Sequence, residues 1–548
     1  MTNRIWFGTI VGLCCLTATA QEPARVGVGV IERRMALEDV LKMALGNNLE
    51  LEIQRTEVSN ARLAIDAARG AFDGIFRWQP GYERRNTPTS SLLFGADGKL
   101  AENFHNQNFS FVQRMPWHGG QVQASFNNNR TATTNPFVGL NPTVTSQFVM
   151  QYTQPLLRNR KTDRERTEIV VRSKQADVSE VDLDLRVTDV VVRTEMAYWD
   201  LVAARQDVTV KAESVSVARE QVDRNKRMID AGTLAPVELA ASEAELARRE
   251  DTYHAAVGVV TEVENSLKTL IAGGRQDDIW KDAIVPSEEN TVERPESNLN
   301  AAVSTALSRR RELRELTLRN EINGTQADLA KDQLRPQVNL VGAYISTGLA
   351  GSQASTSNPF SEANVLTATR LNELSAIAGL PPLPTDGFGS GVPTSLVGGY
   401  GSALSGLFGG SYQSVQVGIS LDWNVRNRAA LSALGQTAVN ERRLKFERAR
   451  TEQAIESQVR NALQALETAR QRITASEAAV KAAKEKLDSE TRLFQSGEST
   501  NFFVLTRQNE YSDSMRRLVV SRLEYNKAVA RLHLALGTTL ETHQISVR

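Results

Sequence analysis

Residues 201–233 read LVAARQDVTVKAESVSVAREQVDRNKRMIDAGT, and residues 466–498 read LETARQRITASEAAVKAAKEKLDSETRLFQSGE. An apolar residue recurs at every seventh position in both stretches, and both run into a glycine, Gly232 or Gly497. The two rows are Leu201, Val208, Val215, Val222 and Ile229, and Leu466, Ile473, Val480, Leu487 and Phe494. A sustained seven-residue period keeps one seam of a helix against a partner helix, so both stretches predict coiled-coil packing that ends at the glycine.

A second pair of seven-residue rows follows the two glycines. These rows are Leu239, Leu246, Tyr253, Val260 and Leu267, and Val504, Tyr511, Leu518, Tyr525 and Leu532. Each half therefore predicts a helical hairpin, over residues 159–272 and 428–537. No proline occurs between Pro155 and Pro236, which leaves roughly 70 residues of helix, or about 105 Å, for the first arm.

The chain is a tandem repeat of one pattern. Every residue of the second-half rows lies 265 positions after its first-half counterpart. The segment 36–45, ALEDVLKMAL, also resembles 298–307, NLNAAVSTAL. Such self-similarity predicts two repeats of equal architecture. We place the first repeat at 21–275, a connector at 276–298, the second repeat at 299–540 and a C-terminal tail at 541–548.

Alternating segments between the helices predict strands within 71–154 and over 337–348 and 412–424. In the last of these, Val415, Val417, Ile419, Leu421 and Trp423 share one face, and polar residues share the other. Loops rich in Gly, Ser, Asn and Pro are expected at 86–104, 130–143 and 349–411. A polar face opposite an apolar face suits a soluble sandwich or a membrane barrel with a wet lumen. The few strands per half favour a barrel that other copies of the chain complete.

The N-terminus has the features of a secretory signal peptide. Arg4 precedes the apolar stretch Ile5 to Leu16, and Ala18-Thr19-Ala20 is a small-x-small cleavage site. We therefore expect residues 1–20 to be removed after export. Both cysteines, Cys14 and Cys15, lie in this segment, so the expected mature chain has no disulfide or Cys-based metal chemistry.

Composition and motifs argue against several function classes. The 64 basic and 64 acidic residues balance, whereas a general nucleic-acid binder needs a basic surplus. The mean hydropathy of -0.33 excludes a polytopic helical membrane protein. None of the five histidines stands at metal-ligand spacing from another (His105, His118, His254, His533 and His543). We therefore expect no enzyme activity, no metal and no cofactor.

Several motifs, in this order and doubled spacing, resemble the TolC-like outer-membrane efflux proteins. They are ALEDVLKMALGNNLEL at 36–51, QPLLR at 154–158, AYWDL at 197–201, IDAGT at 229–233 and FQSGE at 494–498. The resemblance implies a mostly α-helical homotrimer, in which long coiled-coil hairpins form a periplasmic α-barrel that continues into a transmembrane β-barrel closed across three protomers. Such a protein lies in the outer membrane, in contact with its lipid, and has a large periplasmic portion.

The family's function implies a passive duct of a tripartite efflux or type I secretion system. Its partners would be a periplasmic adaptor protein and an inner-membrane pump of the RND, ABC or MFS type. A structural coiled-coil spacer of the cell envelope, which conducts nothing, is the alternative. The two-faced strand at 412–424 discriminates between them, because a spacer needs no strand that faces water on one side.

The resemblance also implies roles for the ends of the hairpins. Adaptor contact would fall on Gly232, Thr233 and Leu234 in the first half and on Gly497, Glu498 and Ser499 in the second. Well-known members close the periplasmic mouth with a Tyr, Arg and Asp network. Phe494, Ser499 and Phe503 occupy those positions here, and Glu238 is the one acidic match, so that network cannot form. The predicted gate is apolar packing of Phe494, Phe502 and Phe503 with Glu238; ordinary coiled-coil core is the other interpretation of these phenylalanines.

The strand count departs from the family. Members typically contribute four barrel strands per protomer, whereas six segments here have strand character, four of them in the first half. The additional hairpin, residues 106–128 around His118-Gly119-Gly120, would either sit above the barrel or widen it.

Overall fold

The computed structural model describes residues 25–26, 29, 31–90, 98–233, 235–288, 298–354, 359–383 and 391–546. The predicted signal peptide at 1–20 and the predicted docking residue Leu234 lie outside these ranges. The described chain is mostly helical, as the sequence predicts. Among the residues that the structure describes, no helix is both long and apolar enough to cross a membrane.

The chain forms two compact units, and each takes segments from both halves of the sequence. The helical unit comprises Met1–Ser59, Val178–Thr317 and Phe446–Arg548, and the sheet unit comprises Asn60–Asp177 and Leu318–Lys445. The helices that contribute residues to both are α2 (Leu49–Arg69), α3 (Arg164–Asp230), α6 (Arg311–Gln333) and α9 (Arg428–Gln495).

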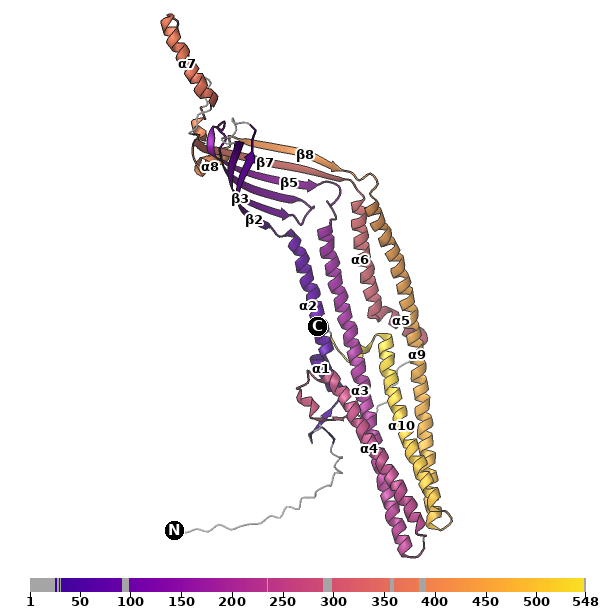
Figure 1. Cartoon of the computed structure of the whole chain (residues 1–548). Coiled ribbons are helices and arrows are strands. Elements are labelled where there is room, and N and C mark those ends of the chain that lie inside the picture. Colours follow the sequence, from indigo (N-terminus) through magenta and orange to yellow (C-terminus); the bar gives the residue numbers. More distant parts are fainter. Residues whose placement is uncertain are drawn as a thin grey trace, which may run out of the picture. The chain divides into compact units, whose positions relative to one another are not determined.

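Two helical hairpins dominate the helical unit (Figure 1). Helix α3 pairs with α4 (Val237–Ile271), and α9 pairs with α10 (Asn501–Leu536). The shorter helices of this unit are α1 (Leu37–Asn47), α5 (Leu299–Arg309) and α11 (Thr539–Thr542). Helix α3 has 67 residues, about 100 Å at the standard rise. The unbroken helix that the absence of proline predicts is therefore confirmed.

Four residues of the first-half rows, and their four counterparts 265 positions later, lie in two apolar cores. Leu201 and Leu267 belong to one core, which also contains Tyr198. Their counterparts 265 residues later, Leu466 and Leu532, belong to the other core. All five side chains are buried. The period therefore identifies the faces that pack, and matched residues of the two halves do the same structural work.

The helical unit also contains a small parallel sheet that the sequence did not predict. Strand β1 (Glu32–Met35) pairs with β6 (Ala283–Pro286), with Glu32 opposite Ala283. Strand β6 falls in the stretch assigned to the connector at 276–298. Four-residue strands contain too few residues for a period of two to be recognised.

The sheet unit contains one antiparallel sheet of six strands in the order β2-β3-β4-β5-β7-β8. The strands occupy the six segments where alternation predicts them: β2 (Ile75–Pro88), β3 (Lys99–Arg114), β4 (Gln121–Thr133), β5 (Leu140–Pro155), β7 (Gln337–Gln353) and β8 (Gln413–Asp422). The additional hairpin is β3–β4, which lies between β2 and β5. Of the two placements left open by the sequence, the structure has the hairpin within the sheet.

The loops are shorter than predicted. Strands β2 and β3 reach to Pro88 and back to Lys99, well into the loop expected at 86–104. The segment 349–411, expected to be a loop, contains the end of β7 and two helices, α7 (Pro359–Ile377) and α8 (Tyr400–Phe408). Residues whose side chains are typical of loops can still belong to a strand, because pairing in the sheet satisfies their backbone N–H and C=O groups. A prediction from composition alone therefore made the strands too short.

Helix α8 packs on the sheet through small residues. A Cβ at Gly348 of β7 would come within 1.8 Å of the Ala403 carbonyl oxygen, so this position admits only glycine. The Ser346 hydroxyl donates to the Leu407 carbonyl at 2.7 Å, and Val144, Ala350 and Ala403 form a small buried core. Such a glycine- and serine-rich helix is stabilised by its close contact with the strands rather than by local propensity.

Candidate functional site

The turn of the first hairpin has the geometry that its glycine predicts. Gly232 has a φ of +75° and nothing lies near a Cβ built there. The Thr233 amide donates to the Met228 carbonyl at 2.9 Å, and the Gly232 amide donates to the Ile229 carbonyl at 2.8 Å. These bonds satisfy carbonyls at the end of α3 in the manner of a glycine C-cap. The side chain of Thr233 is exposed.

The second turn repeats this arrangement. Gly497 has a φ of +79° and open surroundings, and the Glu498 amide donates to the Leu493 carbonyl at 2.9 Å. Glu498 is exposed, whereas Ser499 is half-buried and donates its hydroxyl to Glu490 on α9. The predicted docking residues within the described chain therefore occupy two turns of the same conformation. Their role in docking stays a prediction.

A buried layer of amide and hydroxyl groups joins the two hairpins close to these turns. Gln221 of α3 donates to Asn225 at 2.9 Å and to Asn501 of α10 at 3.0 Å. Asn225 donates to the Ser242 hydroxyl at 2.6 Å, and Asn501 donates to Ser242 at 3.1 Å and to Glu238 at 3.3 Å. Gln221, Asn225, Ser242 and Asn501 are buried. Glu238, which the sequence had singled out, thus takes part in a network that holds α10 against α3 and α4.

The other members of this layer were missed. Asn225 stands three residues after Val222, at the second apolar position of the seven-residue repeat. A polar residue at that position is a recognised device for fixing the register of packed helices. The sequence therefore contained a sign of this layer, but in the apolar positions three residues after each member of the first row and not in the row itself.

We expect Asn501→Ala to lower the free energy of unfolding by about 1–3 kcal/mol, because it leaves buried polar partners without a hydrogen bond. Thermal unfolding in detergent, followed by circular dichroism, measures the change. Thr209→Ala on α3 is the matched control, since its hydroxyl is exposed and bonds only to its own helix; its effect should stay within about 0.5 kcal/mol. Equal effects of the two substitutions would show that the layer is not a stabilising contact.

A second polar layer centres on Arg249 of α4, whose side chain is buried. Its guanidinium donates to the Ser214 carbonyl of α3 at 3.1 Å and to the Glu245 carboxylate at 2.8 Å. It also donates to Gln508 at 3.3 Å and to Asn509 at 3.0 Å, both on α10. One charged side chain therefore connects three helices from the two hairpins.

The carboxyl group of Glu245 is held ionised in this layer. Burial alone raises its pKa, but hydrogen bonds from Arg248 and Arg249 outweigh that effect and lower the pKa from 4.5 to about 2. Because the folded-state pKa lies below the unfolded one, the ionised group stabilises the fold above about pH 4.5. That contribution is lost as the pH falls from 4.5 toward 2.

We expect Glu245→Gln to flatten the loss of stability between pH 4.5 and 2, because the glutamine does not titrate. Melting temperatures of the wild type and the variant, measured at intervals from pH 7 to pH 2.5, give the comparison. Glu477→Gln serves as control, since Glu477 pairs with Arg522 on the exposed surface and should leave the profile unchanged. An unaltered profile for Glu245→Gln would exclude this carboxylate as a source of acid sensitivity.

The phenylalanines predicted to form a gate have different surroundings. Phe494 is 8% exposed, whereas Phe502 and Phe503 are 68% and 48% exposed. The rings of Phe502 and Phe503 meet edge to face, with centroids 5.7 Å apart. Phe494 is therefore packed within the chain, whereas Phe502 and Phe503 form an apolar pair that is exposed on the surface of the helices. Their role as a gate stays a prediction.

The six-stranded sheet has one apolar and one polar face. Directly opposed residues share a face, and the pairing aligns Trp78, Phe109, Phe126 and Phe148 across four strands. On β8 the same face carries the exposed residues Val415, Val417, Ile419 and Leu421. The opposite face carries a polar row across five strands, Gln79, Asn108, Asn127, Gln147 and Thr347, although Val149 and Ile345 also lie on this face.

The apolar face is uncovered over a limited height. On β7 it runs from Val338 to Tyr344, and beyond it Ser346 is covered by α8. On the neighbouring chain segment it runs from Val415 to Trp423. The strand part of this face, from Val415 to the end of β8 at Asp422, is slightly shorter than the roughly 9–11 tilted residues that cross the hydrocarbon layer of a bilayer.

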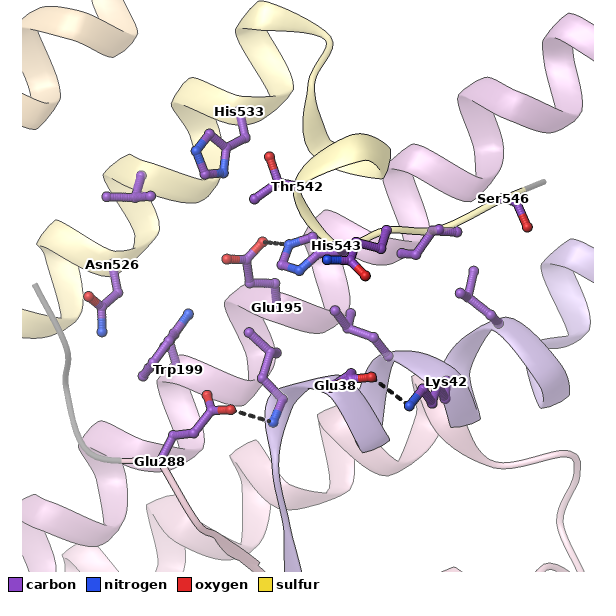
Figure 2. A pocket seen from close by; sticks show the side chains of 16 residues that line it. Glu38, Lys42, Glu195, Trp199, Glu288, Asn526, His533, Thr542, His543 and Ser546 are labelled. Carbon is purple, nitrogen blue, oxygen red and sulfur yellow. Dashed lines mark hydrogen bonds and ion pairs between the residues drawn. The ribbon is translucent and has the colours of Figure 1, made fainter. Parts of the chain in front are cut away.

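A pocket of ≈ 630 Å³ opens in the helical unit between α1, α3, α10 and the C-terminal segment (Figure 2). His543 lies 3.3 Å from the Glu195 carboxylate, and Glu288 accepts a hydrogen bond from the Leu37 amide at 3.2 Å. Over the described part of the chain, no cluster of three or more His, Cys, Asp or Glu residues could hold a metal ion. The contact of His543 with Glu195 attaches the C-terminal segment to α3, and the contact of Glu288 with Leu37 attaches the segment after β6 to α1.

Comparisons with known proteins agree with this architecture. Residues 391–538 match the family described as outer membrane efflux protein, a class of channel rather than of enzyme. A search of curated proteins gives no significant match.

Solved structures of outer-membrane channels share the fold. The Campylobacter jejuni CmeC outer membrane channel is 14% identical with a TM-score of 0.61, over 92% of this chain and 86% of that one. The open state of the Neisseria gonorrhoeae MtrE outer membrane channel is 14% identical with a TM-score of 0.57, over 92% and 89%. The outer membrane protein VceC of Vibrio cholerae is 13% identical with a TM-score of 0.56, over 91% and 96%.

The family match and the fold together support the predicted location in the outer membrane, with a large periplasmic portion. They also confirm the resemblance that the sequence motifs predict. Residues 391–538 of the chain thus match the outer membrane efflux protein family, and the chain has the fold of the outer-membrane channels named above.

Proposed function

We propose that three copies of this chain form a passive duct through the outer membrane, as the exit component of a tripartite efflux or type I secretion system. The observation that carries this proposal is the sheet with one apolar and one polar face, in the same chain as helices of about 100 Å. Lipid on the apolar face and water on the polar face would make the sheet part of a channel wall.

Closure by other copies follows from the open edges of the sheet. One chain supplies six strands, with β2 and β8 at the edges. In a bilayer, each unpaired N–H or C=O group of an edge costs several kcal/mol. A β-barrel shared among protomers would remove these edges. The coiled-coil hairpins of the same three copies would form the periplasmic α-barrel.

The turns at Gly232 and Gly497 are the proposed contact with a periplasmic adaptor, and through it with an inner-membrane pump of the RND, ABC or MFS type. Both turns are exposed and have equivalent conformations, so one adaptor surface could bind each in the same way. The exposed pair Phe502 and Phe503 lies shortly after the second turn and is the proposed apolar element of the periplasmic mouth, beside the layer that contains Glu238.

The alternative of a structural spacer is less well supported. A spacer would need the long hairpins, but it would not need six strands that separate apolar from polar residues over a bilayer-sized height. The polar row through Gln79 and Asn127 has a purpose only where the sheet faces water on that side.

Native mass spectrometry in detergent tests the trimer. We expect a species of about three times the mass of the mature chain, whose predicted precursor has a mass of 60.3 kDa. A sample that contains only monomers, under conditions that preserve its helical content, would contradict a shared barrel. Removal of residues 1–20 is read from the same spectrum.

A further inference from the structure

The two edge strands of the sheet carry no partner on their outer side among the described residues. Strand β2 is exposed along its whole length, and on β8 Val415 and Ile419 are 71% and 70% exposed. The unpaired N–H and C=O groups of long exposed edges can pair with another strand. Adjacent strands are antiparallel throughout, so β2 and β8 run in opposite directions and could continue the same pattern.

We propose that β2 of one copy pairs with β8 of the next copy, so that six strands from each of three copies close an 18-stranded barrel. This inference rests on the proposed trimer and adds the strand number and the partner surface. The additional hairpin β3–β4 is an integral part of the wall, because its strands pair on both sides within the sheet.

Barrel geometry restricts the register of this pairing. Phe76 and Val415 end one line of directly opposed residues across the sheet. Barrel strands tilt by about 35–45°; with a strand spacing of about 4.8 Å and a rise of about 3.3 Å per residue, 18 strands then need a stagger of roughly 18 to 26 residues. Each copy contributes a third of that, so the even shifts within this range are six and eight residues.

A shift of eight residues places Phe76 opposite Trp423 of the neighbouring copy. A shift of eight in the other direction would place residues 414–422 of β8 opposite residues 61–69, which belong to α2 and not to a strand. An even shift also keeps the apolar face continuous, whereas an odd one would exchange the faces. In this register the residue numbers of each opposed pair add up to 499. Residues 413–422 of β8 therefore lie opposite residues 86–77 of β2, so β8 is paired over its whole length.

Side-chain chemistry agrees with this register. Arg77 of one copy lies opposite Asp422 of the next, and opposite charges across an antiparallel pair are favourable. Both side chains are exposed, and in the described ranges neither forms an ion pair. Gln79 lies opposite Ser420 on the polar face. A shift of six residues would instead place Arg77 opposite Ser420 and leave Asp422 without this cation.

The strand number determines the width of the duct. The diameter of a barrel grows roughly in proportion to its strands, so 18 strands give about 1.5 times the diameter of the 12 expected from four strands per copy. The aqueous cross-section of the outer-membrane exit would be about twice as large.

Engineered disulfides between copies test the register. Apart from Cys14 and Cys15, the chain has no cysteine, so cross-links report only on introduced pairs. We expect Gln79→Cys with Ser420→Cys to give covalent dimers and trimers after oxidation in outer membranes, at least tenfold more than pairs shifted by two residues. The shifted pairs are Gln79→Cys with Gly418→Cys and Gln79→Cys with Asp422→Cys. Equal or stronger cross-linking of a shifted pair would overturn the register.

Charge exchange gives a second, independent readout. Arg77→Asp should lower the yield of trimer at least fivefold, and the double variant Arg77→Asp with Asp422→Arg should restore it. If native mass spectrometry finds a trimer but no cross-link forms between β2 and β8, the 18-stranded barrel is wrong and the proposed trimer still stands. Protein that is only monomeric would overturn both.

Discussion

Gly497→Arg is expected to abolish export while trimer formation and outer-membrane insertion stay intact. The glycine has a φ of +79° and nothing lies near a Cβ at this position, so an arginine side chain meets open space. The left-handed conformation costs a non-glycine residue roughly 1–2 kcal/mol, a modest change for this chain. A bulky cation at the turn would, however, obstruct the proposed adaptor surface around Glu498 and Ser499.

The matched control is Gly379→Arg. Gly379 has a φ of +69° and equally open surroundings, but it follows α7 in the sheet unit. The backbone strain is therefore the same, and the proposed docking turn is unaffected. Trimer abundance, cross-linking to the adaptor and export are measured in the same cells. Normal export by Gly497→Arg at normal abundance would remove this turn from the docking surface.

Ile419→Arg should strongly reduce assembly in the outer membrane, whereas the neighbouring Ser420→Arg should not. Ile419 lies near the middle of the apolar face between Val415 and Trp423, and Ser420 lies on the polar face. A cation on the lipid side of a membrane strand costs about 2–4 kcal/mol at mid-depth, and three copies would each bear that cost. An arginine on the polar face would remain in water.

The amount of trimer in purified outer membranes, relative to total protein, measures this difference. We expect Ile419→Arg to lower it at least tenfold and Ser420→Arg to leave it within twofold of the wild type. Equal yields of the two variants would show that the assignment of the two faces is wrong.

The apolar periods predicted the helices and strands because each of these elements buries one face, which repeats apolar residues at a fixed interval. Leu201 and Leu466 could be placed in cores from their seven-residue spacing alone, and both are buried there. Val415 to Leu421 could be placed on a strand with one apolar face because a pleated strand alternates its side chains. Gly232 and Gly497 could be placed at turns because each needs the left-handed conformation.

Contacts between distant segments could not be predicted in the same way. The layer around Asn501 depends on side chains of α3 and α4 that are more than 250 residues away along the chain. Helix α8 exists because Gly348 lets the Ala403 backbone approach the sheet, and its own composition is that of a loop. Neither contact gives rise to a repeating pattern in the sequence, so neither could be predicted from it.

The proposed duct is tested most directly by the conductance of a planar lipid bilayer to which the detergent-purified protein is added. We expect discrete, stable conductance steps, because the polar face of the sheet would line a water-filled passage. A bilayer that stays insulating although the protein has inserted as a trimer would contradict the account.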